Sequence, residues 1–195
     1  LLTDDECLAQ SLAEQLNQEN YERQQIEKGI FQDAEAMIQA QGGPRGVLVL
    51  ASENWHAGVI GIVASRLVER YYVPVVLISL SGEVGKGSCR SIEAFDLYQG
   101  LAACAEHLMQ FGGHHQAAGL TVARHAIDAF RRALEAVAAA RLTKADYRQP
   151  LRLDGSLALG MLTEDVMQWL VRLEPFGMGN PRPVFSFWQV QIRDV

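Results

Sequence analysis

The sequence is poor in cysteine and has no long apolar run, and each absence narrows the class of protein. Its three cysteines, Cys7, Cys89 and Cys104, form no Cys-x-x-Cys pair, which favours a reducing, cytoplasmic setting over a disulfide framework. No apolar run reaches the ~20 residues that a membrane span needs, so no membrane partner is expected. Hydrophobic residues make up 49% of the 195, enough for the core of one or two folded domains.

Strong positive charge is also absent. The net charge is −6, and residues 1–41 carry most of the excess, with nine acidic and two basic side chains. Residues 42–145 carry eight acidic and ten basic side chains, and residues 146–195 carry six and five. Because no segment is strongly basic, a nucleic-acid partner would have to bind in a local groove and not on a wholly basic face.

Residues 1–41 are expected to form a connector, with one long helix over residues 4–41. Leucine and isoleucine recur at helical spacing, Thr3 and Glu6 have the spacing of a capping box, and Gly-Gly-Pro at 42–44 stops the pattern. A helix of this length rises about 57 Å, more than a small domain needs. An ordinary packed helix is one interpretation. We favour a connector to an upstream part, because the chain opens without Met and is expected to come from a longer protein.

Residues 42–145 alternate between strand-like and helix-like segments. Strands are expected at 46–51, 73–78, 84–91 and 117–122, and helices at 58–70, 95–110 and 127–141. Ser-Gly-Glu at 81–83 is expected to turn the second and third strands into a hairpin, which makes part of the sheet antiparallel. The segment is therefore predicted to be an α/β domain with a mixed β-sheet flanked by helices.

Residues 146–195 have a different character, because four prolines separate short segments. Alternating polarity predicts strands at 151–154 and 185–192, and a helix is expected at 163–173. These elements do not close a sheet within the chain. We interpret them as the beginning of a second, β-rich domain.

The first candidate motif spans residues 54–66, which follow a predicted strand and open a predicted helix. His56 lies at that junction, and Gly58 and Gly61 would allow close approach of a ligand to the backbone. In open α/β sheets, ligands bind at the carboxyl ends of strands and near helix N-termini. A capping or packing role for His56 explains the spacing equally well.

The second motif is Lys-Gly-Ser-Cys-Arg-Ser at residues 86–91. On a strand, Lys86, Ser88 and Arg90 point to one face and Cys89 points to the other, into the core. A hydroxyl beside a guanidinium fork suits a phosphate oxygen. The alternative is a solvated strand face, which is common for charged residues.

The third motif, Phe-Gly-Gly-His-His-Gln-Ala-Ala-Gly at residues 111–119, places two glycines before two histidines. Successive backbone N–H groups in such a loop can bind an anion, and a histidine beside them can donate to a phosphate. A metal site is less well supported, because no clustered carboxylates or spaced ligands accompany the pair, although distant ligands remain open. A serine nucleophile is also poorly supported, because the sequence has no Gly-x-Ser-x-Gly elbow. The three motifs are expected to converge at one edge of the sheet on a phosphate-containing ligand.

In this order, the motifs at 55–66, 86–91 and 111–119 resemble the DHH-associated domain of the RecJ family. The segment 173–185, Leu-Glu-Pro-Phe-Gly-Met-Gly-Asn-Pro-Arg-Pro-Val-Phe, is similar to the family's entry into its oligonucleotide-binding (OB) barrel. The glycine–histidine run alone is shared with other DHH phosphoesterases and with alanyl-tRNA synthetase relatives. The Trp-His helix and the Glu-Pro-Phe-Gly segment narrow the resemblance to RecJ.

The resemblance implies a function in DNA repair and recombination. RecJ proteins are exonucleases that degrade single-stranded DNA from the 5′ end, so the chain would be the substrate-binding half of such an enzyme, inactive alone. The family's catalytic domain, with its Asp-His-His signature, lies upstream of the matching region. Mg²⁺ or Mn²⁺ would be bound there, and none by this chain. Single-stranded DNA is the implied partner, with a single-strand-binding protein and a helicase as further family partners.

The resemblance also implies residue roles. Ser88 and Arg90 would bind a phosphate near the 5′ end or the scissile group, and His56 would contact another phosphate. Arg66 matches the motif but would serve packing or a salt bridge. His107 and His125 match nothing and are expected to be surface residues.

The glycine–histidine run would line the same cleft. His114 would contact phosphates and act catalytically by stabilising charge at the scissile phosphate. Gly112 and Gly113 would offer backbone donors, whereas His115 is less well fixed by the family pattern. A RecJ-like nucleic-acid-binding or scaffold module without catalysis remains the alternative. Hydrolysis of a small nucleotide is weakened by the OB-like segment, because OB folds bind extended strands.

Overall fold

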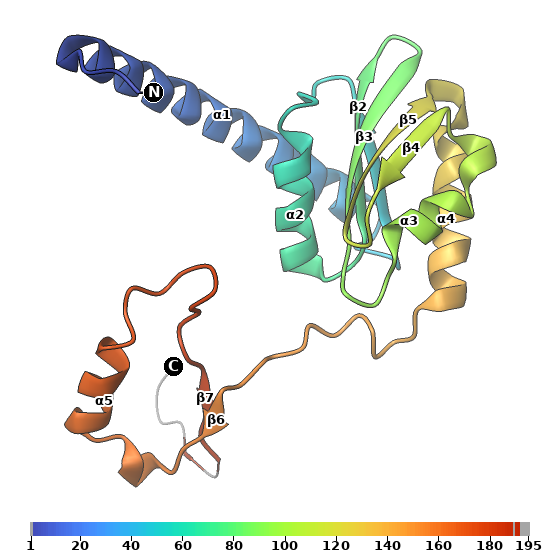
Figure 1. Ribbon diagram of the computed structural model, residues 1–195. Coiled ribbons are helices and arrows are strands. Elements are labelled where there is room, and N and C mark those ends of the chain that lie inside the picture. The colour runs from blue at the N-terminus through green and yellow to red at the C-terminus, as the bar shows by residue number, and fades with distance from the viewer. Residues whose placement is uncertain (1, 189, 192–195) are drawn as a thin grey trace. The chain divides into compact units, whose positions relative to one another are not determined.

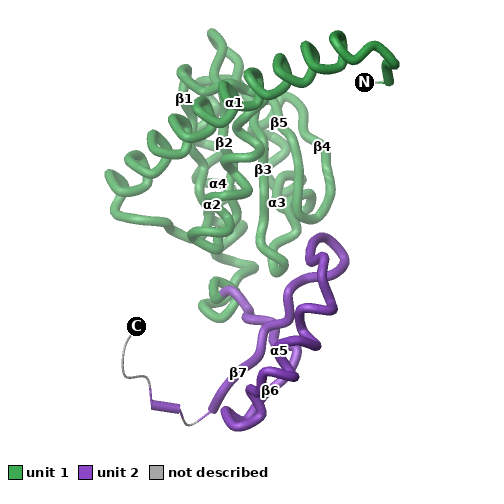
Figure 2. The backbone as a smooth tube through the Cα atoms, turned by 90° about the vertical axis from the view of Figure 1, so that its left-hand side faces the viewer, with its two compact units in different colours: residues 1–148 green, residues 149–195 purple. Residues whose placement is uncertain are grey.

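The computed structural model describes residues 2–188 and 190–191. The chain divides into two compact units, residues 1–148 and residues 149–195, which are described separately (Figure 2). No helix in the described part of the chain is long and apolar enough to cross a membrane.

A long helix, α1 (Glu6–Ala40), opens the first unit. Its N-cap is Asp5, whose carboxylate accepts a hydrogen bond from the Leu8 N–H at 3.1 Å, so the expected capping box of Thr3 and Glu6 is wrong. Only the C-terminal half is buried, through side chains that recur at helical spacing: Glu27, Ile30, Ala34 and Ile38. The N-terminal half extends away from the rest of the unit (Figure 1).

A five-stranded sheet forms the centre of the first unit, with the strand order β1-β2-β3-β5-β4. The strands are β1 (Leu48–Ser52), β2 (Val75–Ser81), β3 (Val84–Arg90), β4 (Gln110–Gly113) and β5 (Ala117–Ala123). β1 and β2 are parallel, and every other neighbouring pair is antiparallel. The prediction of a mixed sheet containing a β2–β3 hairpin is therefore confirmed.

Alternate residues of the strands face two helical layers. Leu48, Leu50, Val75 and Leu77 pack with α1 and α2 (Ile60–Tyr71) on one face. The opposite face packs against α3 (Leu97–Ala102) and α4 (Ile127–Arg141) through a second set of buried residues: Val49, Val76, Cys89, Leu120 and Val122. Since each strand of the β1–β2 half is covered on both sides, its sequence is almost continuously apolar.

The expected helix over residues 95–110 is wrong in length. Asp96 accepts from the Gln99 N–H at 3.0 Å and caps α3, which already ends at Ala102. A 3₁₀ turn, Ala105–His107, follows, and Gln110 begins β4. The expected helix is thus confirmed over Leu97–Ala102, whereas Gln110 pairs with Thr121 of β5, a distant contact that local periodicity does not reveal.

The second unit contains a short helix and a two-stranded parallel sheet. Helix α5 (Glu164–Val171) is capped by Thr163, and β6 (Gly155–Ser156) pairs with β7 (Phe185–Ser186). The expected strand at 151–154 is not formed, because pairing begins only at Gly155. The expected strand at 185–192 is confirmed only for its first residues, and positions 189 and 192 lie outside the described residues.

Candidate nucleic-acid interface

On one face of the sheet β5 and β4 are open to solvent and β3 is partly covered by α2, and we call it the open face. It is the continuation of the face that α1 and α2 cover over β1 and β2. In the strand register Ser88 of β3 lies beside Gly119 of β5, and Gly119 lies beside Gly112 of β4. Ala117 and Gly119 are exposed. The floor of the open face between β3 and β4 thus consists of backbone and a single methyl group, over two strand spacings or about 10 Å.

Ser88 and Arg90 form one side of this floor. The Arg90 guanidinium donates to the Ser88 hydroxyl at 3.3 Å and to the Cys89 carbonyl at 2.8 Å. Helix α2 passes directly above them, because a Cβ built at Gly61 would lie 2.9 Å from Ser88 Oγ and 3.2 Å from an Arg90 nitrogen. Gly61 therefore lets α2 approach the serine–arginine pair closely, which limits the conformations open to both side chains.

Arg90 differs in its partners from the five arginines of the first unit that form ion pairs. Those five bind carboxylates: Arg23, Arg66, Arg70, Arg124 and Arg131. Within residues 2–188 and 190–191, no carboxylate lies within ion-pair distance of Arg90, whose hydrogen bonds go to neutral oxygens. A half-buried guanidinium without a counter-ion has favourable electrostatics for a phosphate.

The glycine–histidine run forms the far side of the open face. It is a tight hairpin and not the loop that the sequence predicted, because β4 extends to Gly113 and the His114 N–H donates to the Ala117 carbonyl at 2.8 Å. Along an edge strand, successive N–H groups point alternately toward the paired strand and away from it. The Gly112 N–H, two residues before that of His114, therefore points to Gly119, and the Gly113 N–H points to the outer edge of the sheet. The N–H groups of Gly112 and His114 are therefore used within the hairpin.

The tip of this hairpin is held on two sides. The Ser91 N–H donates to the Gln116 carbonyl at 3.0 Å, and the Leu97 N–H donates to the His115 carbonyl at 2.9 Å. His114 and Arg90 both lie opposite Ala117, on its two sides. The structure thus brings Ser88, Arg90, Gly112, Gly113 and His114 together at one end of the open face.

His56 lies toward the opposite end of the sheet. It follows the carboxyl end of β1, whereas β3 runs antiparallel to the parallel pair β1–β2, so Arg90 ends its strand on the other side. His56 is therefore displaced along the sheet from Arg90, whereas Gly61 of the same motif lies against Ser88 and Arg90. The convergence of the three motifs is thus seen for Gly61 and stays a prediction for His56.

The structure defines the hydrogen bonding of His56. The Gly58 N–H donates to His56 Nδ1 at 3.2 Å, so a neutral His56 carries its proton on Nε2. Because the side chain is exposed, this Nε2–H can donate to a ligand.

The preceding residue holds this histidine loop in place. The Trp55 indole donates to the Asp33 carboxylate of α1 at 2.7 Å, and the Trp55 carbonyl accepts from the Ser79 hydroxyl at 2.6 Å. Trp55 is buried. It is therefore a positioning residue, which sequence analysis could not assign because its partner Asp33 lies on another element.

Arg66 has the structural role that the sequence allowed. Its guanidinium pairs with Glu27 at 2.8 Å and lies 4.7 Å from the centre of the Phe31 ring. Glu27 is buried and also binds Arg23 at 2.9 Å. These contacts attach the C-terminal half of α1 to α2.

The remaining histidines and cysteines do not assemble a metal site in the described part of the chain, where no group of three His, Cys, Asp or Glu side chains could hold an ion. His107 lies 3.6 Å from the Glu106 carboxylate, and His125 is exposed. Burial raises the pKa of Cys89 to about 12, with a smaller opposing effect from Arg90. Cys89 is thus an inert core thiol, which points away from the open face.

Sequence analysis missed the importance of β5. Ala117 and Gly119 were placed on the predicted strand at 117–122 but were given no part in binding, yet they form the floor beside Ser88 and Arg90. Their alternation with buried Ala118 and Leu120 is the signal that places them on the exposed face of that strand.

Comparison with known proteins assigns this geometry to a class. Residues 45–140 match the DHHA1 domain model, and residues 153–195 match the RecJ OB domain model. The chain is therefore a DHHA1 domain followed by an OB domain. Because the second match is specific to RecJ, and RecJ proteins match along essentially the whole chain, it belongs to the RecJ family.

The relatives are single-stranded-DNA-specific exonucleases. The chain is 36% identical to RecJ of Bacillus subtilis over 100% of its own length and 25% of the relative's. It is 35% identical to RecJ of Thermus thermophilus over 95% of its length and 26% of the relative's. The crystal structure of RecJ in complex with Mg²⁺ from Thermus thermophilus matches with a TM-score of 0.81, over 95% of this chain and 28% of that one. A structure of exonuclease RecJ bound to manganese matches with a TM-score of 0.64, over 73% and 35%.

Proposed function

We propose that this chain forms the substrate-binding half of an exonuclease that degrades single-stranded DNA from its 5′ end. The observation that carries the proposal is the serine–arginine pair beside a floor without side chains. Arg90 has no carboxylate partner among the described residues. Its guanidinium group lies beside the Ser88 hydroxyl, and the two groups together suit a phosphate oxygen. The RecJ relatives, of which the chain spans about a quarter, support the choice of single-stranded DNA over other phosphate-containing ligands.

The open face suits a single strand better than a small nucleotide. Its floor at Ala117 and Gly119 allows a sugar-phosphate backbone to approach the sheet directly. Ser88 and Arg90 would bind a phosphate on one side of this floor, and His114 would contact the strand from the other. In this role His114 would donate to the scissile phosphate and stabilise its charge, while Gly113 offers a backbone N–H at the sheet edge.

The chain itself would contribute binding and orientation. Three of the structures of relatives contain Mg²⁺ or Mn²⁺. The described residues of this chain offer no cluster of metal ligands, so they do not fit such an ion. A divalent ion would therefore be held by another part of the intact protein, and we assign no reaction step to a metal bound here.

Arg90→Ala tests the proposal in the intact protein. Degradation of labelled single-stranded DNA should fall by more than tenfold, because a hydrogen bond to a charged group contributes about 1.5–3 kcal/mol. Arg132→Ala is the matched control, since Arg132 is an exposed arginine on α4, the helix of the opposite face. Equal activity of wild type and Arg90→Ala would remove Arg90 from the site.

A second candidate is a nucleic-acid-binding or scaffold module without catalysis. The lack of a metal-ligand cluster among the described residues favours it for the chain by itself. Incubation of residues 1–195 with Mn²⁺ and labelled single-stranded DNA should give no hydrolysis under either candidate. An Asp-His-His signature with paired aspartates elsewhere in the intact protein would decide for the exonuclease, and its absence would decide for the module.

A further inference from the structure

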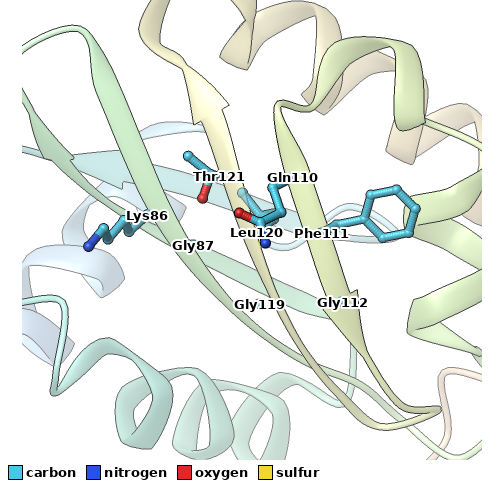
Figure 3. Close-up of a pocket in the computed structure, with 8 residues that line it drawn as sticks. All are labelled: Lys86, Gly87, Gln110, Phe111, Gly112, Gly119, Leu120 and Thr121. Atoms are coloured by element: carbon cyan, nitrogen blue, oxygen red, sulfur yellow. The ribbon is translucent and has the colours of Figure 1, made fainter.

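A row of polar side chains crosses the open face next to the serine–arginine pair. In the strand register Lys86 of β3 lies beside Thr121 of β5, and Thr121 lies beside Gln110 of β4. Residues directly opposite one another in an antiparallel sheet share a face, so all three side chains are on the open face. Figure 3 shows Thr121 and Gln110 close together, with Lys86 reaching out from β3 on the other side. We call these three residues the polar row.

The polar row lines a hollow in the sheet surface. The hollow has a volume of about 340 Å³, and its wall also includes Gly112 and Gly119. The floor described for the serine–arginine pair therefore continues without interruption into the polar row. Phe111 points away from the open face, which leaves the row without an aromatic cover (Figure 3).

The charge of Lys86 is uncompensated in the described structure. No carboxylate lies within ion-pair distance of it there, and its side chain is exposed. A second hollow, of about 390 Å³, adjoins it on the β2 side and is lined by Ala57, Ser79, Ser81, Val84 and Lys86. Lys86 thus stands between two hollows, and the second reaches the loop that carries His56.

The spacing along β3 matches that of a nucleic-acid backbone. Lys86 is two residues from Ser88, or about 6.6 Å, and four residues from Arg90, or about 13 Å. Successive phosphates of an extended single strand have a separation of the same order as the first of these distances. A strand that follows β3 would therefore bring a new phosphate to Lys86 when another is bound at Ser88 and Arg90.

We propose that the polar row is a second nucleotide-binding site, at which Lys86 binds a phosphodiester group and Thr121 and Gln110 hydrogen-bond the adjoining nucleotide. This inference rests on the proposed function, since it assumes that a single strand lies on the open face. It adds a direction, because the strand runs along β3 from the serine–arginine pair toward the loop of His56. Hydroxyl and amide groups can both donate and accept, which suits the mixed polar edge of a nucleotide.

Lys86→Met in the intact protein tests the phosphate contact. Binding of oligothymidylate is measured by fluorescence anisotropy in chelator, over a series of salt concentrations. Affinity at low salt should fall about three- to tenfold. The slope of log K against log salt should become shallower by about 0.7, the contribution of one phosphate in a single strand. Lys144→Met is the matched control, because Lys144 is exposed in a loop outside the sheet.

Gln110→Glu tests the other half of the row without changing its shape. A carboxylate in the hollow should repel the strand and weaken binding more at low salt than at high salt. Gln149→Glu is the control at an exposed site of the second unit. Suppose that wild type binds and that Arg90→Ala weakens binding, but that Lys86→Met and Gln110→Glu do not. The proposal of a second nucleotide-binding site is then wrong, and the proposed function stands. If wild type does not bind the strand at all, both fall.

Discussion

Gly61 of α2 lies so close to Ser88 of β3 that a Cβ at position 61 would be 2.9 Å from the serine hydroxyl. The same Cβ would be 3.2 Å from an Arg90 nitrogen. This close approach couples the position of α2 to the geometry of the serine–arginine pair. It follows that a single methyl group on α2 can alter the candidate phosphate site without touching the core of the sheet.

Gly61→Ala is expected to weaken single-stranded-DNA binding with little effect on stability. The added methyl should rotate the Ser88 hydroxyl away from Arg90, with an affinity loss of about tenfold, which corresponds to one charge-assisted hydrogen bond. The free energy of unfolding should change by less than about 1 kcal/mol, because the helical preference of alanine offsets the crowding. Urea denaturation and anisotropy binding measure the two quantities on the same protein.

Gly29→Ala provides the matched control for this change. Gly29 is also helical, but a Cβ there meets no atom within 4 Å. The control should gain up to about 1 kcal/mol of stability and bind DNA as wild type does. Unchanged binding in Gly61→Ala would show that the approach of α2 does not control the serine–arginine pair.

Alanine substitution at the two neighbouring glycines of the hairpin should affect stability to very different degrees. Gly113 has a φ of +149°, and a Cβ there would lie 2.4 Å from the Ala118 Cα and 2.5 Å from the Ala117 carbonyl oxygen. Because both contacts are with backbone, Gly113→Ala should cost about 2–4 kcal/mol in the free energy of unfolding.

Gly112→Ala should leave stability within about 0.5 kcal/mol of wild type, since no atom lies within 4 Å of the new Cβ. It should nevertheless weaken DNA binding, because the methyl group would stand on the floor of the open face. Comparable losses of stability in the two variants, measured by urea denaturation, would contradict this reading of the hairpin.

Thiol chemistry should separate the three cysteines. Burial raises the pKa of Cys89 to about 12 and also raises the pKa of Cys104, whereas Cys7 is exposed on α1. Since the thiolate is the reactive form, iodoacetamide at pH 8 should label Cys7 in the native protein and the other two only after denaturation. Peptide mass spectrometry gives the result, and rapid native labelling of Cys89 would place it outside the core.

The same shift gives a pH dependence of stability. The pKa of Cys89 rises from 9.0 to about 12 in the folded protein, so the unfolded chain loses this proton first as the pH rises. Its contribution to the free energy of unfolding is therefore constant below pH 9 and falls between pH 9 and about 12. Cys89→Ala should lack this part of the alkaline destabilisation.

Helix α4 shows what the sequence could predict. Both of its ends agree with the expected range, because Ile127, Phe130, Leu134 and Ala138 recur on one face and are all buried. The segment at 95–110 shows the opposite case. It was predicted as one helix, but α3 ends at Ala102 and Gln110 begins β4, whose pairing with β5 is a contact between distant residues that local spacing does not reveal.

The candidate site was predicted in its parts and not in its arrangement. The alternation of side chains along β3 correctly predicted that Ser88 and Arg90 share one face and that Cys89 lies in the core. The hairpin at 81–83 was also predicted, and it already required Arg90 and the loop of His56 to lie toward opposite ends of the sheet. The close approach of Gly61 to Ser88 could not be predicted, because it depends on how α2 packs across the sheet.

The floor formed by Ala117 and Gly119 affects how a bound strand could move along the open face. At these two positions the surface consists of backbone and one methyl group, so it offers no side chain that would hold one base more tightly than the next. A strand on such a surface would meet nearly the same environment after each shift by one nucleotide, so the barrier between successive positions would be low. The absence of side chains would thus favour repeated stepwise advance along any base sequence, with the charged residues at the sides keeping the strand attached.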